Sequence, residues 1–168
     1  QPFAVFLGDD TIHADVPVKQ QMIDVYRKHN DPVIAVERVS RDRTSDYGIV
    51  AAKRAGEHLY QVTDLVEKPS PEEAPSDLAI IGRYILTPDI FSHLEKTAAG
   101  RGGEIQLPDG LRALFHPRSI YAYRFAGQRY DTGDKLGFLK ATVEFALRRP
   151  DLGDAFRLPG VEPARLRE

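Results

Sequence analysis

The sequence contains no cysteine among its 168 residues, which excludes a disulfide framework and a zinc–thiolate site. Its histidines are not spaced as metal ligands, so we expect surface or hydrogen-bonded side chains at His13, His29, His58, His93 and His116. No apolar run approaches the ~20 residues needed to cross a bilayer, and no charged-then-apolar leader is present. We therefore expect no membrane partner and a cytoplasmic protein.

An excess of charge of one sign is also lacking. The 23 basic and 25 acidic residues give a formal net charge of −2, and the basic residues are scattered along the chain. Nucleic-acid-binding domains usually gather their basic residues in a patch or stripe, so we expect no nucleic-acid partner. The length suits one domain with a core. We expect that domain to cover residues 1–156, followed by a tail over residues 157–168.

Strand and helix patterns alternate along the chain, which is typical of an α/β fold. An apolar run over residues 3–7 predicts a buried parallel strand, and a helix closed by Asn30 separates it from a second strand at residues 32–36. Two strands at 47–51 and 59–66 are expected to pair as a hairpin. The remaining predicted elements are strands at 78–86 and 119–125 and helices at 87–94, 104–115 and 134–149. Together these elements predict an α/β fold with a mixed, mainly parallel sheet.

Helix ends are marked by capping residues. Thr87, with Pro88 in the first turn, is predicted to cap one helix, and Asp134 is predicted to cap the last one. In that last helix Leu136, Leu139, Val143 and Leu147 share a face. The chain opens directly on an apolar strand, and an uncovered strand edge is an aggregation hazard. We therefore expect further strands to precede Gln1 in the parent protein.

Two aspartates follow strands at places where α/β proteins bind ligands. Asp9 ends the opening strand, and Asp131 follows a strand and precedes the last long helix. Since Mg²⁺ usually takes one or two carboxylates and completes its shell with phosphate and water, these two residues are candidate ligands. Asp9 could instead be a turn residue and Asp131 a helix cap. Paired carboxylates also serve glycoside hydrolysis, which stays a competing interpretation.

The tripeptide Glu67-Lys68-Pro69 ends another strand. The proline favours an extended Lys68, which would send the two charged side chains to opposite sides. A lysine suits a phosphate and a carboxylate suits sugar hydroxyls, although solvated charges in a surface turn are the common alternative. Because glycoside hydrolysis needs no lysine, this residue favours phosphoryl chemistry.

Several segments together resemble the bacterial UTP:glucose-1-phosphate uridylyltransferases, from Phe3 to about Phe156. The matching segments are Leu7–Asp10, Val66–Pro69, Ile81–Pro88, Gly103–Leu107 and Tyr130–Ala141. The resemblance implies a Rossmann-like nucleotide-diphospho-sugar transferase fold. It also implies that a glucose 1-phosphate oxygen attacks the UTP α-phosphorus and expels pyrophosphate. UTP and glucose 1-phosphate would be the small-molecule partners, Mg²⁺ the cofactor, and the protein a homo-oligomer.

The resemblance also implies roles for individual residues. Asp9 and Asp131 would hold Mg²⁺ and, with Lys68 on the sugar phosphate, form the catalytic set. The residues implied at the substrate are Gly48, Glu67, Lys68, Gly82, Arg83, Glu104 and Gln106, with Arg83 also suited to packing. At positions 108 and 110 the family's helix has threonine and alanine, and this chain has Pro108 and Gly110. We therefore expect Pro108 either to lie in the first turn of the helix or to shorten it.

The glycine-rich Gly-x-Gly-Thr-Arg loop that would grip the nucleotide has no counterpart in the sequence. We therefore expect a fold incomplete at its N-terminus, and 168 residues that are inactive alone. Base selection would lie in the absent part, which leaves a dTTP or ATP enzyme open. A non-catalytic fragment that binds a sugar phosphate or a partner chain is the remaining alternative.

Overall fold

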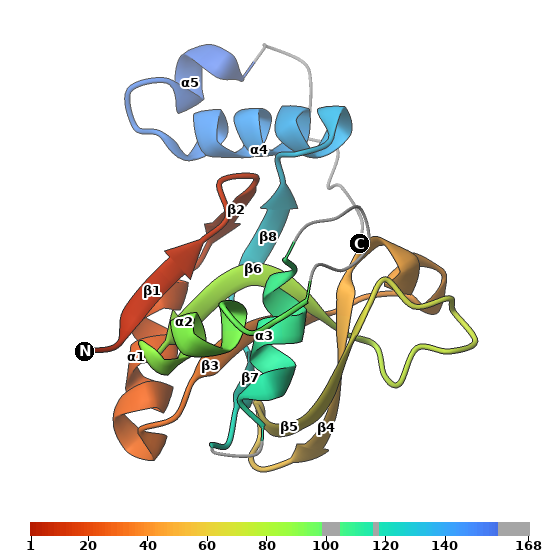
Figure 1. Ribbon diagram of the computed structural model, residues 1–168. Helices are drawn as coiled ribbons and strands as arrows, with labels where there is room; N and C mark the ends of the chain where they lie inside the picture. The colour runs from red at the N-terminus through yellow and green to blue at the C-terminus, as the bar shows by residue number, and fades with distance from the viewer. Residues whose placement is uncertain (99–104, 116–117, 158–168) are drawn as a thin grey trace. The chain divides into compact units, whose positions relative to one another are not determined.

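The computed structural model describes residues 1–98, 105–115 and 118–157 (Figure 1). The chain forms two compact units. The first comprises Gln1–Leu7 and His13–Gly127, and the second comprises Gly8–Ile12 and Gln128–Glu168. Within the described residues, no helix has both the length and the apolar character needed to span a membrane.

A six-stranded sheet forms the first unit, in the order β1-β6-β3-β7-β5-β4. Its strands are β1 (Phe3–Phe6), β3 (Val33–Arg38), β4 (Gly48–Arg54), β5 (Leu59–Glu67), β6 (Leu78–Leu86) and β7 (Tyr121–Arg124). The sheet is mixed, as predicted. Among its described pairings, however, only β3 and β7 run parallel, which differs from the mainly parallel sheet expected from the sequence.

The insertion of β6 explains this difference. Strands β1 and β3 point the same way and are joined through helix α1 (Val18–His29), but β6 lies between them and pairs antiparallel with both. Strands β4 and β5 form the predicted hairpin, and a direct connection between neighbouring strands requires antiparallel pairing. The short 3-10 helix η1 (Arg41–Asp46) leads from β3 into β4.

Strand β1 is not the buried parallel strand that the sequence predicted. Its residues alternate between half-buried and exposed, and it pairs antiparallel with β6 from Phe3 opposite Leu86 to Phe6 opposite Arg83. The residues of β1 are apolar on both faces of the strand, but only one face is partly buried. In the strand order of this sheet β1 stands at one end.

The core of the first unit lies between the sheet and two short helices, α2 (Asp89–Leu94) and α3 (Leu107–Ala113), which pack against each other (Figure 1). Ile34 and Val36 of β3 belong to the buried hydrophobic cluster that also contains residues of α2 and α3. Val33 and Ala35 point to the opposite face, as strand alternation requires, and are equally buried. Helix α1 contacts β3 and β6. Strand β3 is therefore buried on both faces.

The helix ends test the capping predictions. Asn30 closes helix α1 as its C-cap, as predicted, and its backbone has the left-handed conformation. The predicted Thr87 cap is wrong, because its hydroxyl is buried without a hydrogen-bond partner and Pro88 is the N-cap of α2. Pro108 lies in the first turn of α3, as predicted. Gly110 leaves room there for Leu94, whose side chain a Cβ on Gly110 would overlap.

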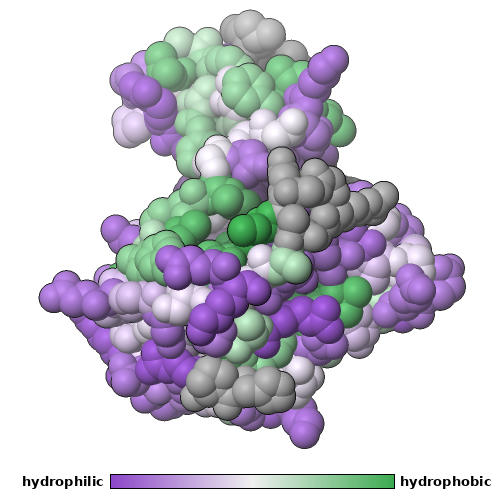
Figure 2. Space-filling model, viewed as in Figure 1, coloured by the Kyte–Doolittle hydropathy of each residue, from purple (hydrophilic) through white to green (hydrophobic). Residues whose placement is uncertain are grey.

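The second unit contains a two-stranded sheet of β2 (Asp10–His13) and β8 (Gln128–Asp131), followed by α4 (Lys135–Arg148) and α5 (Gly153–Phe156). Asp134 caps α4 as predicted, accepting hydrogen bonds from the backbone N–H groups of Leu136 (2.8 Å) and Gly137 (3.0 Å). Leu136 and Leu139, on the predicted apolar face of α4, are about 60% exposed. Hydrophobic residues are visible on the surface of the part of the molecule that contains α4 and α5 (Figure 2).

Candidate functional site

The two predicted metal ligands lie together in the second unit. Asp9 precedes β2, Asp131 ends β8, and the Thr132 N–H donates to the Asp9 carbonyl at 2.7 Å. A Cβ on Gly133 would stand 3.2 Å from Asp131 Oδ1 and 3.7 Å from Asp9 Oδ2. Both carboxylates therefore border the same small space, which stays open because residue 133 has no side chain.

This donor set fits a magnesium ion. Mg²⁺ prefers hard oxygen ligands and commonly takes only one or two carboxylates, leaving positions for phosphate oxygens and water. Asp9 is exposed and Asp131 half-buried, so a bound ion could keep such partners. Across residues 1–98, 105–115 and 118–157, no group of three or more His, Cys, Asp or Glu side chains could enclose a metal. The open pair suits a metal shared with a substrate better than a structural cage.

Asp131 is not the helix cap that was its alternative interpretation. Its Oδ1 accepts the Gly133 N–H at 3.1 Å, while Asp134 caps α4. The first turn of α4 approaches the Asp131 backbone so closely that a Cβ on Gly137 would overlap the Asp131 carbonyl oxygen. The start of α4 therefore fixes the backbone from which Asp131 projects.

A buried arginine, which sequence reasoning missed, connects two of the acids. Arg129 donates from Nε to Asp10 Oδ1 and from Nη2 to Asp131 Oδ2, the latter at 3.2 Å. Burial raises the pKa of the Asp10 carboxyl above its ordinary value, and the Arg129 hydrogen bond opposes that shift. The Asp10 carboxylate is thus held by Arg129 inside the second unit. The sequence did contain one indication of this contact. Arg129 and Asp131 are two residues apart on one strand, so their side chains lie on the same face.

Three further predicted residues lie together at the β4–β5 pair of the first unit. Gly48 is opposite Glu67 in the pairing, and a Cβ on Gly48 would stand 3.0 Å from Glu67 Oε2. Lys68 has a φ of 46°, so the predicted extended backbone is wrong. Its N–H donates to the Tyr47 carbonyl at 3.0 Å, which continues the hairpin contact and outweighs the preference set by Pro69. Glu67 and Lys68 are both exposed.

Gly82 and Arg83 are engaged in packing against the end of β1. Gly82 has a φ of +68°, and a Cβ there would come within 2.9 Å of the Leu7 side chain. The Arg83 guanidinium donates to the Leu7 carbonyl at 2.5 Å and lies over the Phe6 ring at 5.3 Å. These contacts support the packing role that the sequence left open for Arg83.

The other two predicted substrate residues belong to the α3 segment. Gln106 is the N-cap residue of α3, with an extended backbone and no side-chain capping bond. Glu104 lies outside the described residues. The role of both residues at a substrate stays a prediction.

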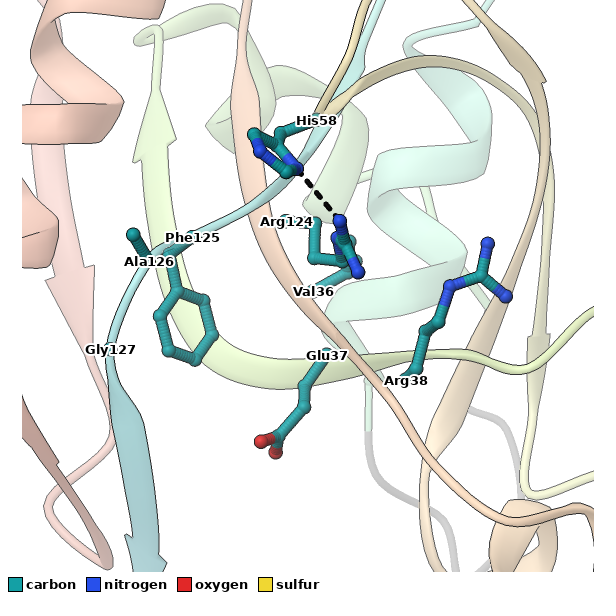
Figure 3. Close-up of a pocket in the computed structure, with 8 residues that line it drawn as sticks. All are labelled: Val36, Glu37, Arg38, His58, Arg124, Phe125, Ala126 and Gly127. Carbon is teal, nitrogen blue, oxygen red and sulfur yellow. Dashed lines mark hydrogen bonds between the residues drawn. The ribbon is translucent and has the colours of Figure 1, made fainter.

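A separate pocket of about 280 Å³ lies at the carboxyl ends of the parallel strands β3 and β7 (Figure 3). The Arg124 Nη2 and His58 Nδ1 atoms lie 2.8 Å apart and form a hydrogen bond in which arginine can act only as the donor. Buried Val36 and Phe125 supply apolar wall. The sequence did not predict this pocket, because its lining residues come from three distant segments.

Comparison with known proteins places the chain in a family. Residues 1–147 match the nucleotidyl transferase family model. The chain is 48% identical over 159 residues to the UTP–glucose-1-phosphate uridylyltransferase of Streptococcus pneumoniae, covering 92% of this chain and 53% of that protein. It is 46% identical over 154 residues to the Bacillus subtilis enzyme of the same name, again covering 92% and 53%. The chain thus spans about half the length of the curated relatives it matches.

Solved structures agree with these relatives. A UDP-glucose pyrophosphorylase complexed with UDP-glucose superposes with a TM-score of 0.84 at 43% identity, covering 88% of this chain and 57% of that one. A UTP-bound enzyme from Acinetobacter baumannii gives 0.82 at 35% identity, covering 92% and 54%. The resemblance found in the sequence is confirmed, and the chain belongs to the nucleotidyl transferase family.

Proposed function

We propose that this chain carries the metal-binding and sugar-phosphate-binding residues of a UTP:glucose-1-phosphate uridylyltransferase. The reaction transfers the uridylyl group of UTP to glucose 1-phosphate. A phosphate oxygen of the sugar attacks the α-phosphorus, and pyrophosphate leaves. The names of the relatives and the UDP-glucose bound to a solved neighbour support this substrate pair.

The observation that carries the proposal is the placement of Asp9 and Asp131 around the open space at Gly133. Bound there, Mg²⁺ would neutralise charge on the phosphates during the transfer. The two aspartates would hold the ion, and the exposed Asp9 would leave it reachable by substrate oxygens. Catalysis in such a site rests on positioning and charge neutralisation, with no covalent protein intermediate.

The β4–β5 pair supplies the proposed sugar-phosphate residues. Lys68 offers a point charge to the phosphate of glucose 1-phosphate, and Glu67 accepts hydrogen bonds from sugar hydroxyls. Gly48 leaves the space in which the Glu67 carboxylate stands. Gln106 and Glu104 are proposed to add polar contacts to the sugar. Gly82 and Arg83 support the site through the end of β1.

Three further properties belong to the proposal. The enzyme is a cytoplasmic homo-oligomer that draws on the nucleotide and sugar-phosphate pools of metabolism. The 168 residues bind glucose 1-phosphate but do not complete the transfer, because nothing in them corresponds to a glycine-rich nucleotide loop. UTP is the preferred nucleotide, and dTTP and ATP are the alternatives that a nucleotide panel on the longer enzyme would decide.

Sugar selectivity tests the proposal on this chain. We expect glucose 1-phosphate to bind more tightly than glucose 6-phosphate in a calorimetric titration with Mg²⁺, because the phosphate and the hydroxyls must meet Lys68 and Glu67 together. Glu67→Gln should weaken binding, and Glu72→Gln in the neighbouring loop should not. Equal binding of the two sugar phosphates would contradict the proposed sugar-phosphate site. Release of pyrophosphate from UTP by this chain would contradict the proposal that the 168 residues are inactive alone.

A further inference from the structure

The Arg129 guanidinium is buried between two carboxylates of the second unit. Only 9% of its side chain is exposed, against 7% for Asp10 and 34% for Asp131. Arg129 Nε donates to Asp10 and Nη2 donates to Asp131. A fixed guanidinium fork that meets two acids at once restricts the orientation of both.

The two oxygens of Asp131 have different partners as a result. Oδ2 accepts from Arg129 at 3.2 Å, and Oδ1 accepts from the Gly133 N–H at 3.1 Å. It is Oδ1 that borders the space shared with Asp9. The bond to Arg129 thus leaves Oδ1 turned toward that space.

An arginine beside a cation site would by itself repel the cation, since like charges a few ångströms apart interact strongly where water is excluded. Asp10 supplies the opposite charge on the other side of the guanidinium. The cluster of Asp9, Asp10, Asp131 and Arg129 keeps a formal charge of −2. A divalent cation would match that charge.

We propose that Arg129, held by Asp10, is a positioning residue that turns Asp131 Oδ1 toward the cation site between Asp9 and Asp131. This inference rests on the proposed function, because it assumes that these aspartates bind a divalent ion. It assigns Asp10 the role of neutralising Arg129. Neither residue touches the ion.

The test measures direct binding of Mn²⁺ to the 168-residue chain. The electron paramagnetic resonance signal of free Mn²⁺ reports the binding, and Mg²⁺ serves as competitor. The variants are Arg129→Lys, Arg129→Gln and Asp10→Asn, and the matched control is Arg149→Gln, which breaks an exposed ion pair with Asp151 in the same unit. Asp131→Asn reports the metal site itself. Circular dichroism verifies that each variant folds.

We expect Mn²⁺ affinity to fall about 10-fold or more in the Arg129 variants, as is typical when a residue that orients a metal ligand is lost. The loss in Arg129→Gln is the sharper result, since removing a positive charge would otherwise tighten cation binding. Asp10→Asn should also weaken binding, and Arg149→Gln should bind as the unsubstituted chain does. If Arg129→Gln fails to fold, Arg129→Lys decides, because lysine keeps the charge but lacks the planar fork.

Two failures are distinguishable. If the unsubstituted chain binds Mn²⁺ and Asp131→Asn abolishes binding, but the folded Arg129 variants bind normally, the positioning role is overturned and the metal site stands. If Asp131→Asn binds as the unsubstituted chain does, or if no Mn²⁺ binds at all, the proposed metal site and this inference are overturned together.

Discussion

The Glu67 carboxylate lies directly over the backbone of Gly48, where a Cβ would come 3.0 Å from Oε2. The two residues are opposite one another in the β4–β5 pair. The absence of a side chain at position 48 therefore determines where the carboxylate can stand. A Cβ at that position would crowd Glu67 Oε2, whereas Ile80 Cδ1, at 3.4 Å, would make an ordinary contact.

Gly48→Ala is expected to weaken glucose 1-phosphate binding by about 2 kcal/mol, the value of a hydrogen bond to a charged group. The alanine methyl would crowd Glu67 Oε2 and shift the carboxylate from the position proposed for sugar binding. Isothermal titration with Mg²⁺ measures the loss. Gly56→Ala in the β4–β5 turn is the control, because its Cβ would make only an ordinary 3.4 Å contact with Leu59. Unchanged affinity in Gly48→Ala would separate Glu67 from the sugar.

Gly133→Ala is expected to weaken Mn²⁺ binding, because its methyl group would occupy the space bordered by Asp131 Oδ1 and Asp9 Oδ2. Gly8→Ala is a close control in the same unit, since a Cβ there meets no atom within 4 Å. Both variants can be compared in the same Mn²⁺ titration. A Gly133→Ala chain with the affinity of Gly8→Ala would show that the ion binds elsewhere.

The left-handed backbone of Lys68 predicts an unusual order of stability. Lys68→Gly should be more stable to urea than Lys68→Ala by about 1 kcal/mol, because only glycine adopts a φ of 46° without steric cost. Lys53 in β4 is the reference position, where the glycine variant should be the less stable one. The same order at both positions would contradict the backbone described for Lys68.

Asp134→Ala should lower the free energy of unfolding by about 1 kcal/mol, the usual cost of losing an N-cap. Its carboxylate accepts from two backbone N–H groups in the first turn of α4. The change should also loosen Asp131, whose backbone that turn contacts. Asp154→Ala removes a carboxylate that is 98% exposed and should have little effect in the same denaturation series. Equal effects of the two substitutions would argue against the cap.

Local rules predicted those parts of the molecule that local sequence determines. Asp9 and Asp131 were placed together because ligand sites form where strands of α/β sheets end. The hairpin of β4 and β5 and the Asp134 cap follow from short-range pattern and side-chain chemistry. The hairpin and the cap need no knowledge of distant pairing, whereas the meeting of Asp9 and Asp131 also depends on the pairing of β2 with β8.

Long-range contacts account for what the sequence did not reveal. The place of β6 between β1 and β3 depends on pairing across the sheet, which no single segment specifies. The Lys68 backbone follows its hydrogen bond to Tyr47 rather than the preference set by Pro69. Arg129 was overlooked because its partner Asp10 lies more than a hundred residues away, although its spacing from Asp131 was visible.

Lys68 is proposed to bind the phosphate of glucose 1-phosphate, and calorimetric titration of this chain in the presence of Mg²⁺ tests this role directly. The unsubstituted chain should bind glucose 1-phosphate, and Lys68→Ala should lose about 2 kcal/mol of binding free energy with the removed charge. Lys53→Ala, in the same hairpin, should bind normally. Equal binding by the unsubstituted chain and Lys68→Ala, or no binding by either, would contradict the claim.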